Sequence, residues 1–140
     1  MEFVNFKISK KLKEKGFTCN YPFAMYNELG DFHPLYTSCE ETLVNCMFGN
    51  RGYYDYDDFD EADCIAPTIS QVLKWLREQH SIHISTKPYP CEDGAMWLYE
   101  IRKFNKYISI VAANKTGFIR EEESALAGIE YVLDNLINVI

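Results

Sequence analysis

The sequence predicts an α+β protein, a two-layer sandwich in which helices cover one face of an antiparallel sheet. Ala66–Ile84 combines a helix start signal, an apolar stripe at helical spacing and a sudden change to strict alternation, which is typical of a helix followed directly by a strand. Two more alternating segments follow, Met96–Phe104 and Tyr107–Ala113, and then an amphipathic helix from Glu121 to about Asn138. This α-β-β-β-α order places two helices on one face of three strands.

The central helix has a clear beginning. We expect the Thr68 hydroxyl to accept a hydrogen bond from the Gln71 N–H while the Gln71 side chain returns to the Thr68 N–H, and Pro67 suits the position before such a cap. The apolar stripe that follows contains Ile69, Val72, Leu73 and Leu76, with Trp75 on its flank. Alternation from Ser81 predicts a strand over Ile82–Lys87 and then a loop containing Pro88, Pro90 and Gly94.

The first half predicts a short helix and a hairpin. Residues 3–15 place Val4, Ile8 and Leu12 on one helical face, and Gly16 suits the left-handed residue that ends a helix, with Phe17 folding back. Residues 21–37 predict two strands around the turn Asn27–Asp31, with Pro34 restricting the second strand to a sheet edge. Thr42–Phe48 fits either a strand or a helical turn, and residues 49–65 predict a loop.

Length and composition indicate one soluble domain. The 140 residues suit a single domain, in which residues 1–65 carry the helix, hairpin and acidic aromatic loop and residues 66–140 form the α-β-β-β-α core. No apolar run approaches the roughly 20 residues of a membrane helix, and the N-terminus does not resemble a signal peptide. We therefore expect a cytoplasmic protein whose five cysteines are free and mostly buried thiols.

Charge is distributed unevenly. The formal net charge is −7, five of the fourteen basic residues lie between Lys7 and Lys15, and ten of the twenty-one acids lie between Glu28 and Asp63. This balance argues against a large nucleic-acid footprint, which needs a basic face. Lys10, Lys11 and Lys13 are the candidate residues for a small one, although a lysine run at a helix C-terminus is more often a solvated face.

Two resemblances follow from these elements. The α-β-β-β-α order is similar to that of the double-stranded-RNA-binding domain, but the last helix begins with Glu121, Glu122 and Glu123 where that family has basic residues. The shared order therefore implies architecture without the function.

The second resemblance covers most of the chain. It is carried by Lys13-Glu14-Lys15-Gly16-Phe17, by Ala66-Pro67-Thr68-Ile69-Ser70 through Trp75-Leu76-Arg77-Glu78, by Ile82-His83-Ile84, and by Glu122–Ile129. In these motifs the chain resembles a family of short proteins of phage, prophage and mobile elements in gut bacteria of the Bacteroides type. The resemblance implies a fold rather than an activity, because the motifs coincide with caps and core positions. Arg120 stands where that family usually has Thr, so we expect no side-chain cap there.

The acidic aromatic loop is the candidate site for a partner. Tyrosine offers a large contact area at low entropic cost, and the loop residues concerned are Tyr53, Tyr54, Tyr56, Asp57 and Asp58. A calcium loop starting at Asp55 fails at its fifth and sixth positions, which are Phe59 and Asp60. The simplest interpretation is a solvated acidic loop.

Other candidate sites are weaker. His80, His83 and Cys91 could supply part of a zinc site, but such sites need four ligands or three and a water, and His80 fits better at the helix C-terminus. Glu100 and Arg102 favour a charge-paired, solvated sheet surface over an acid–base pair. For Trp97, Tyr99 and Ile101 a core position under the helices is favoured over an exposed patch.

The sequence therefore predicts no catalytic site, metal site or cofactor. The leading hypothesis is a non-enzymatic protein of a phage or mobile element that binds a host or self protein, including a homodimer. The alternative is a nucleic-acid-associated module that uses the lysine face of the first helix and the sheet aromatics.

Overall fold

The structure is a computed structural model, and it describes residues 2–19, 22–34, 63–92, 94–104, 108–113 (backbone only) and 117–137. Within these residues the protein is α+β, with three helices and antiparallel sheets, as predicted. The chain divides into two compact units, one ending at Gln71 and the other beginning at Val72. The boundary falls inside a continuous helix.

Helix α1 (Phe6–Glu14) begins three residues later than predicted. The Asn5 side-chain oxygen accepts a hydrogen bond from the Ile8 N–H at 2.9 Å, so Asn5 is the N-cap. Val4 is fully buried but lies before the helix, where its N–H donates to the Pro67 carbonyl at 3.0 Å. The prediction that Val4 belongs to a helical stripe is wrong, because the Asn5 cap makes the helix begin at Phe6, after Val4.

The C-terminal end of α1 has the predicted glycine cap. Gly16 has a φ of 80°, a conformation that favours glycine. The Phe17 N–H donates to the Leu12 carbonyl at 3.0 Å and the Gly16 N–H to the Lys13 carbonyl at 3.2 Å. These two bonds form the Schellman arrangement, and they direct Phe17 into the core, where it is fully buried.

The first unit contains a three-stranded antiparallel sheet of order β2-β1-β3. Strands β1 (Ala24–Tyr26) and β2 (Phe32–Pro34) form the predicted hairpin, and Pro34 lies in the edge strand β2 as expected. Strand β3 (Cys64–Ile65) falls in the segment predicted as a loop, and both of its residues are buried. A two-residue strand has too few positions to show alternation in sequence.

Helix α3 (Ile69–His80) has the predicted reciprocal cap. The Thr68 hydroxyl accepts from the Gln71 N–H at 3.1 Å, and the Gln71 side-chain oxygen accepts from the Thr68 N–H at 2.9 Å. The buried face of α3 differs from the predicted stripe. Trp75 is buried, whereas Ile69 and Leu73 are half-buried. The indole therefore belongs to the core and not to its flank.

The sheet of the second unit has the order β4-β5-β6, built from β4 (Ile82–Cys91), β5 (Gly94–Phe104) and β6 (Ile108–Ala113). The change from helix to strand occurs at Ser81, as predicted, where φ is 54°. Ile82 and Ile84 are buried and His83 and Ser85 are not. Residues 105–106, which connect β5 and β6, lie outside the described residues.

Strand β4 is longer than predicted and continues through both prolines, with Pro88 opposite Trp97 and Pro90 opposite Ala95. Trp97 exchanges backbone hydrogen bonds with Phe118 on its other side, at 2.7 and 2.8 Å. Its N–H and C=O therefore point away from β4, so Pro88 needs no donor toward β5. Pro90, two residues further along β4, has the same orientation, with its nitrogen pointing away from β5. An edge strand can contain proline where the backbone nitrogen points away from the neighbouring strand. The prediction of a loop at Pro88 and Pro90 is therefore wrong, because both residues belong to β4.

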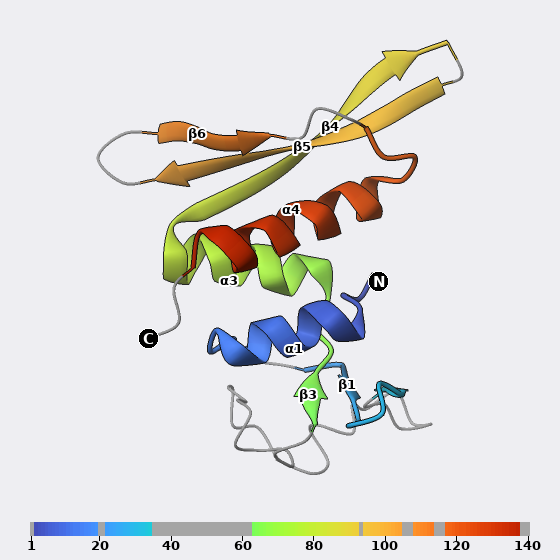
Figure 1. Cartoon of the computed structure of the whole chain (residues 1–140), viewed down its shortest axis with the longest axis vertical. Helices are drawn as coiled ribbons and strands as arrows, with labels where there is room; N and C mark the ends of the chain where they lie inside the picture. The colour runs from blue at the N-terminus through green and yellow to red at the C-terminus, as the bar shows by residue number, and fades with distance from the viewer. Residues whose placement is uncertain are drawn as a thin grey trace. The chain divides into compact units, whose positions relative to one another are not determined.

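Helix α4 (Glu121–Asn135) packs on β4 and β5, and Figure 1 shows α3 and α4 on the same side of this sheet. Its buried residues include Ala125, Ile129, Val132 and Leu133 of the predicted stripe. A Cβ at Gly128 would lie 3.0 Å from Ile84 Cγ2 and 3.3 Å from Tyr99 Cγ, so the helix approaches the sheet closely there. Tyr99 and the fully buried Ile101 face the helix side, as predicted.

The capping box of α3 gives a first prediction. We expect Thr68→Val, which keeps the volume of this buried side chain and removes its hydroxyl, to lower the free energy of unfolding by about 1 kcal/mol. Thr68→Ser should lose less, because it retains the acceptor. Chemical denaturation measures both changes, and equal losses in the two variants would show that packing rather than the cap is responsible.

Gly128 gives a second prediction. We expect Gly128→Leu to destabilise the protein by about 1–3 kcal/mol, because the new side chain would overlap Ile84 and Tyr99. Glu123→Leu, an exposed position of the same helix, is the matched control and should cost less than about 1 kcal/mol. Thermal and urea unfolding provide the measurement. A neutral Gly128→Leu variant would mean that α4 does not depend on this close contact.

Candidate interaction surface

The antiparallel strands β4 and β5 place alternate side chains on the face opposite α4. We call this side the open face, because no described helix of this unit covers it (Figure 1). Its members follow from the register of the two strands and are His83, Ser85, Lys87, Tyr89, Met96, Leu98, Glu100, Arg102 and Phe104.

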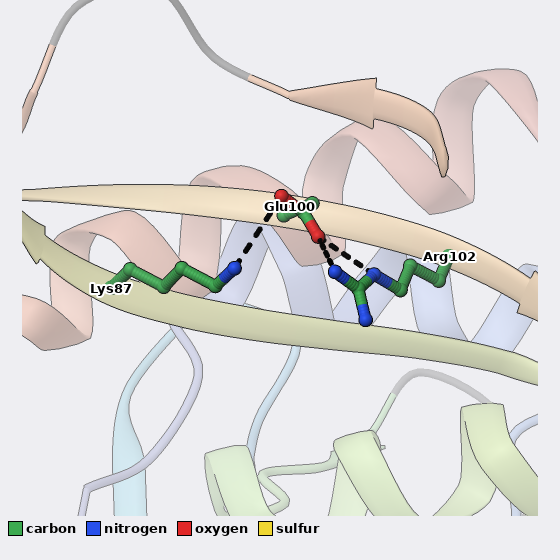
Figure 2. Close-up of polar contacts among 3 residues, drawn as sticks. All are labelled: Lys87, Glu100 and Arg102. Atoms are coloured by element: carbon green, nitrogen blue, oxygen red, sulfur yellow. Dashed lines mark hydrogen bonds and ion pairs between the residues drawn. The ribbon is translucent and has the colours of Figure 1, made fainter. Parts of the chain in front are cut away.

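Three charged side chains form an ion-paired cluster on the open face. The Arg102 Nε donates to Glu100 Oε1 at 2.7 Å, and the Arg102 Nη2 lies 2.5 Å from the same oxygen. The Lys87 Nζ lies 3.7 Å from Glu100 Oε2. Figure 2 shows the Glu100 carboxylate between the two cations, with Lys87 on β4 and both other residues on β5. The predicted charge pairing of Glu100 with Arg102 is confirmed.

The same face also carries apolar and aromatic groups. Tyr89 is 59% exposed and Phe104 is 38% exposed, while Met96 and Leu98 are half-buried. The His83 and Phe104 rings have centroids 6.0 Å apart, and His83 Nδ1 is buried without a hydrogen-bond partner. The solvent side of an antiparallel sheet is normally polar, so this concentration of large apolar side chains is the notable feature of the unit.

The three residues of the suggested zinc site do not come together. His83 and Cys91 lie eight residues apart on the same continuous strand, which corresponds to about 26 Å. Within the described residues no group of three His, Cys, Asp or Glu side chains could hold a metal ion.

His80 ends α3, as its sequence position suggests, but its ring packs edge-on against Trp75 with centroids 4.7 Å apart. Burial lowers the pKa of the His80 imidazole below its usual 6.5, because desolvation penalises the charged ring. Desolvation is thus the main influence on this pKa, and the placement of His80 at the C-terminal end of α3 is as predicted.

The candidate nucleic-acid lysines lie on α1, and all three have contacts within the protein. The Lys13 Nζ donates to the Asp63 carbonyl at 2.7 Å. The Lys10 Nζ lies 4.8 Å from the centre of the Phe6 ring, in a cation–π contact. Lys11 is half-buried. The sheet aromatics of the same hypothesis, Trp97 and Tyr99, lie on the helix side of β5 rather than on the open face.

The candidate partner loop, Tyr53, Tyr54, Tyr56, Asp57 and Asp58, lies outside the described residues, as do the start of the calcium-like sequence at Asp55 and the segment Thr42–Phe48. The structure therefore leaves these predictions as they stand.

Three cysteines are described, and none of these three forms a disulfide. Cys64 is buried, Cys19 is half-buried and Cys91 is exposed, so the expectation of mostly buried thiols is wrong for these three. Burial raises the pKa of the Cys64 thiol, although Lys13 and Lys10 act in the opposite direction. A raised pKa makes Cys64 a structural thiol rather than a nucleophile.

The open face as a whole was missed from the sequence. Its Tyr89 belongs to the segment predicted as a loop, and Phe104 was placed only at the end of a strand. The sequence could have indicated this face if the strand alternation had been continued beyond Pro88. Tyr89 and Cys91 are even numbers of residues from His83 and therefore lie on the same face of β4.

Comparisons with protein-family models, curated proteins and solved structures find no match for this chain. Among the described residues, no helix is long and apolar enough to cross a membrane.

His80 gives a prediction about pH. Since its pKa is lowered in the folded state, the unfolded chain binds the proton more readily, and the free energy of unfolding falls as the pH drops below about 6.5. We expect His80→Phe, which keeps an aromatic ring on Trp75 and cannot be protonated, to lose less stability between pH ~7.5 and ~5.5 than the unmodified protein. Denaturant titrations at both pH values measure the difference. Equal losses in both proteins would show that His80 does not contribute to the pH dependence.

Proposed function

We propose that the protein is a non-enzymatic binding protein of a phage or mobile element, acting through protein–protein contacts with a host protein or a second copy of itself. The observation that supports this proposal is the open face, where exposed aromatic and half-buried apolar side chains lie around an ion-paired arginine. Tyrosine, phenylalanine, methionine and arginine are enriched in protein interfaces, and tyrosine and arginine are frequent among the residues that dominate binding energy.

The rigidity of the open face also favours binding. It lies on two long, hydrogen-bonded strands, and its ion pairs hold Arg102 in a defined position. A side chain that is already ordered loses less conformational entropy when a partner binds. The face would therefore present arginine and aromatic groups to a partner with a small ordering cost.

The nucleic-acid alternative has less support. Lys10 and Lys13 already contact other groups of the first unit, and Trp97 and Tyr99 face the helix side of the sheet. Stacking on bases requires accessible aromatic rings beside a basic groove.

Two variants test the proposal. We expect Phe104→Asp to weaken self-association, or capture of a host partner, by about tenfold or more, because it places a charge in the apolar part of the open face. Leu29→Asp is the matched control, since Leu29 is 80% exposed and lies in the turn between β1 and β2, outside the open face. Sedimentation velocity over a concentration series measures self-association, and cross-linking with mass spectrometry in a host lysate identifies partners.

Retention of all binding by Phe104→Asp would contradict the proposal. Salt-dependent binding of single-stranded oligonucleotides, measured by fluorescence polarisation, would instead favour the nucleic-acid alternative.

A further inference from the structure

We propose that the open face receives a partner segment in which an acidic residue is flanked by apolar side chains, with its carboxylate on Arg102 and Lys87. This inference rests on the proposed function, because it specifies the chemistry of the partner for the same surface. Four observations on the described residues support it.

The first is the charge of the cluster. Lys87 and Arg102 supply two positive charges and Glu100 one negative charge, so the cluster retains one net positive charge on a chain whose formal charge is −7. A guanidinium has five N–H donors. The described contacts direct only Nε and Nη2 of Arg102 toward Glu100. Donors of Arg102 therefore remain for a second carboxylate, which guanidinium groups bind well.

The second observation is the order of exposure. The side chain of Lys87 is 58% exposed and that of Arg102 is 38% exposed, whereas that of Glu100 is 20% exposed. The carboxylate is thus the least exposed member of the cluster, and the two cations are its more accessible groups. A molecule that approaches the open face meets positive charge first, which favours an acidic group and disfavours a basic one.

The third observation is the arrangement of apolar groups along β5. The open-face residues occur in the order Met96, Leu98, Glu100, Arg102 and Phe104, so apolar side chains lie on both sides of the charged pair. Consecutive members of such a row are about 7 Å apart. The complementary ligand has apolar groups about 7 to 14 Å on either side of its carboxylate, a span that fits a short extended or helical segment.

The fourth observation is an unsatisfied polar atom at the same end of the face. His83 lies opposite Arg102 in the register, and its Nδ1 is buried without a hydrogen-bond partner. Buried polar atoms in folded proteins are usually hydrogen-bonded. His83 Nδ1 is thus a polar atom without a partner on the residue opposite Arg102, where the proposed carboxylate would bind.

A selection experiment tests the inference on the full-length protein. Linear peptides of about 12 residues, long enough to cover the row on β5, would be displayed and selected on the immobilised protein, with depletion on the Phe104→Asp variant. We expect the peptides that depend on the open face to carry Asp or Glu between apolar residues. Face-dependent peptides without an acidic residue would overturn this inference and leave the proposed function intact. A selection that returns no face-dependent peptide would count against both.

Binding measurements then test whether the carboxylate of the peptide binds Arg102. For a selected peptide, we expect Arg102→Gln in the protein, or Glu→Gln in the peptide, to weaken binding about tenfold, with little further loss when both changes are combined. Arg120→Gln is the matched control, because Arg120 pairs with Glu122 at 3.4 Å outside the open face and the change should leave affinity unaltered. The peptide substitution does not depend on the folding of a protein variant. Additive losses, or an equal loss with Arg120→Gln, would overturn the inference.

Discussion

The close contact of α4 with β4 and β5 at Gly128 decides which side of the second sheet is available for binding. A helix can approach the sheet this closely only because residue 128 has no side chain, and the approach buries Ile84 and Ile101 on the helix side. Since successive side chains of a strand alternate between faces, burial of this set sends Lys87, Glu100 and Arg102 to the other side. The open face is thus a direct consequence of how the core is packed.

The edge of β4 adds a second constraint. Pro88 and Pro90 remove two outward-facing N–H donors from the outer half of this strand, and edge prolines are one way in which proteins prevent pairing with a further strand. A partner at this part of the sheet would therefore bind through side chains of the open face rather than through backbone pairing. This agrees with the proposal that side-chain chemistry, namely arginine, lysine and aromatic groups, selects the partner.

The ion cluster matters for recognition more than for stability. Partly exposed ion pairs contribute at most about 1 kcal/mol to folding, because water screens the charges and side-chain entropy opposes ordering. Their value lies in position, since Glu100 holds the Arg102 guanidinium beside the apolar row of β5. A fixed guanidinium next to Phe104 and Leu98 combines charge selectivity with the apolar burial that supplies affinity.

The sequence by itself determined the elements whose causes are local. The Thr68–Gln71 cap, the Gly16 helix end, the 27–31 turn and the change of period at Ser81 depend on residues within a few positions of one another, and each was predicted. Only the tertiary structure decided that Trp75 is core, that β4 continues through two prolines, that Cys64–Ile65 forms a strand, and that Tyr89 and Phe104 share a face with Arg102. These features depend on which strand lies alongside and on which side a helix packs. Such contacts join residues far apart in the chain, and local spacing alone does not decide them.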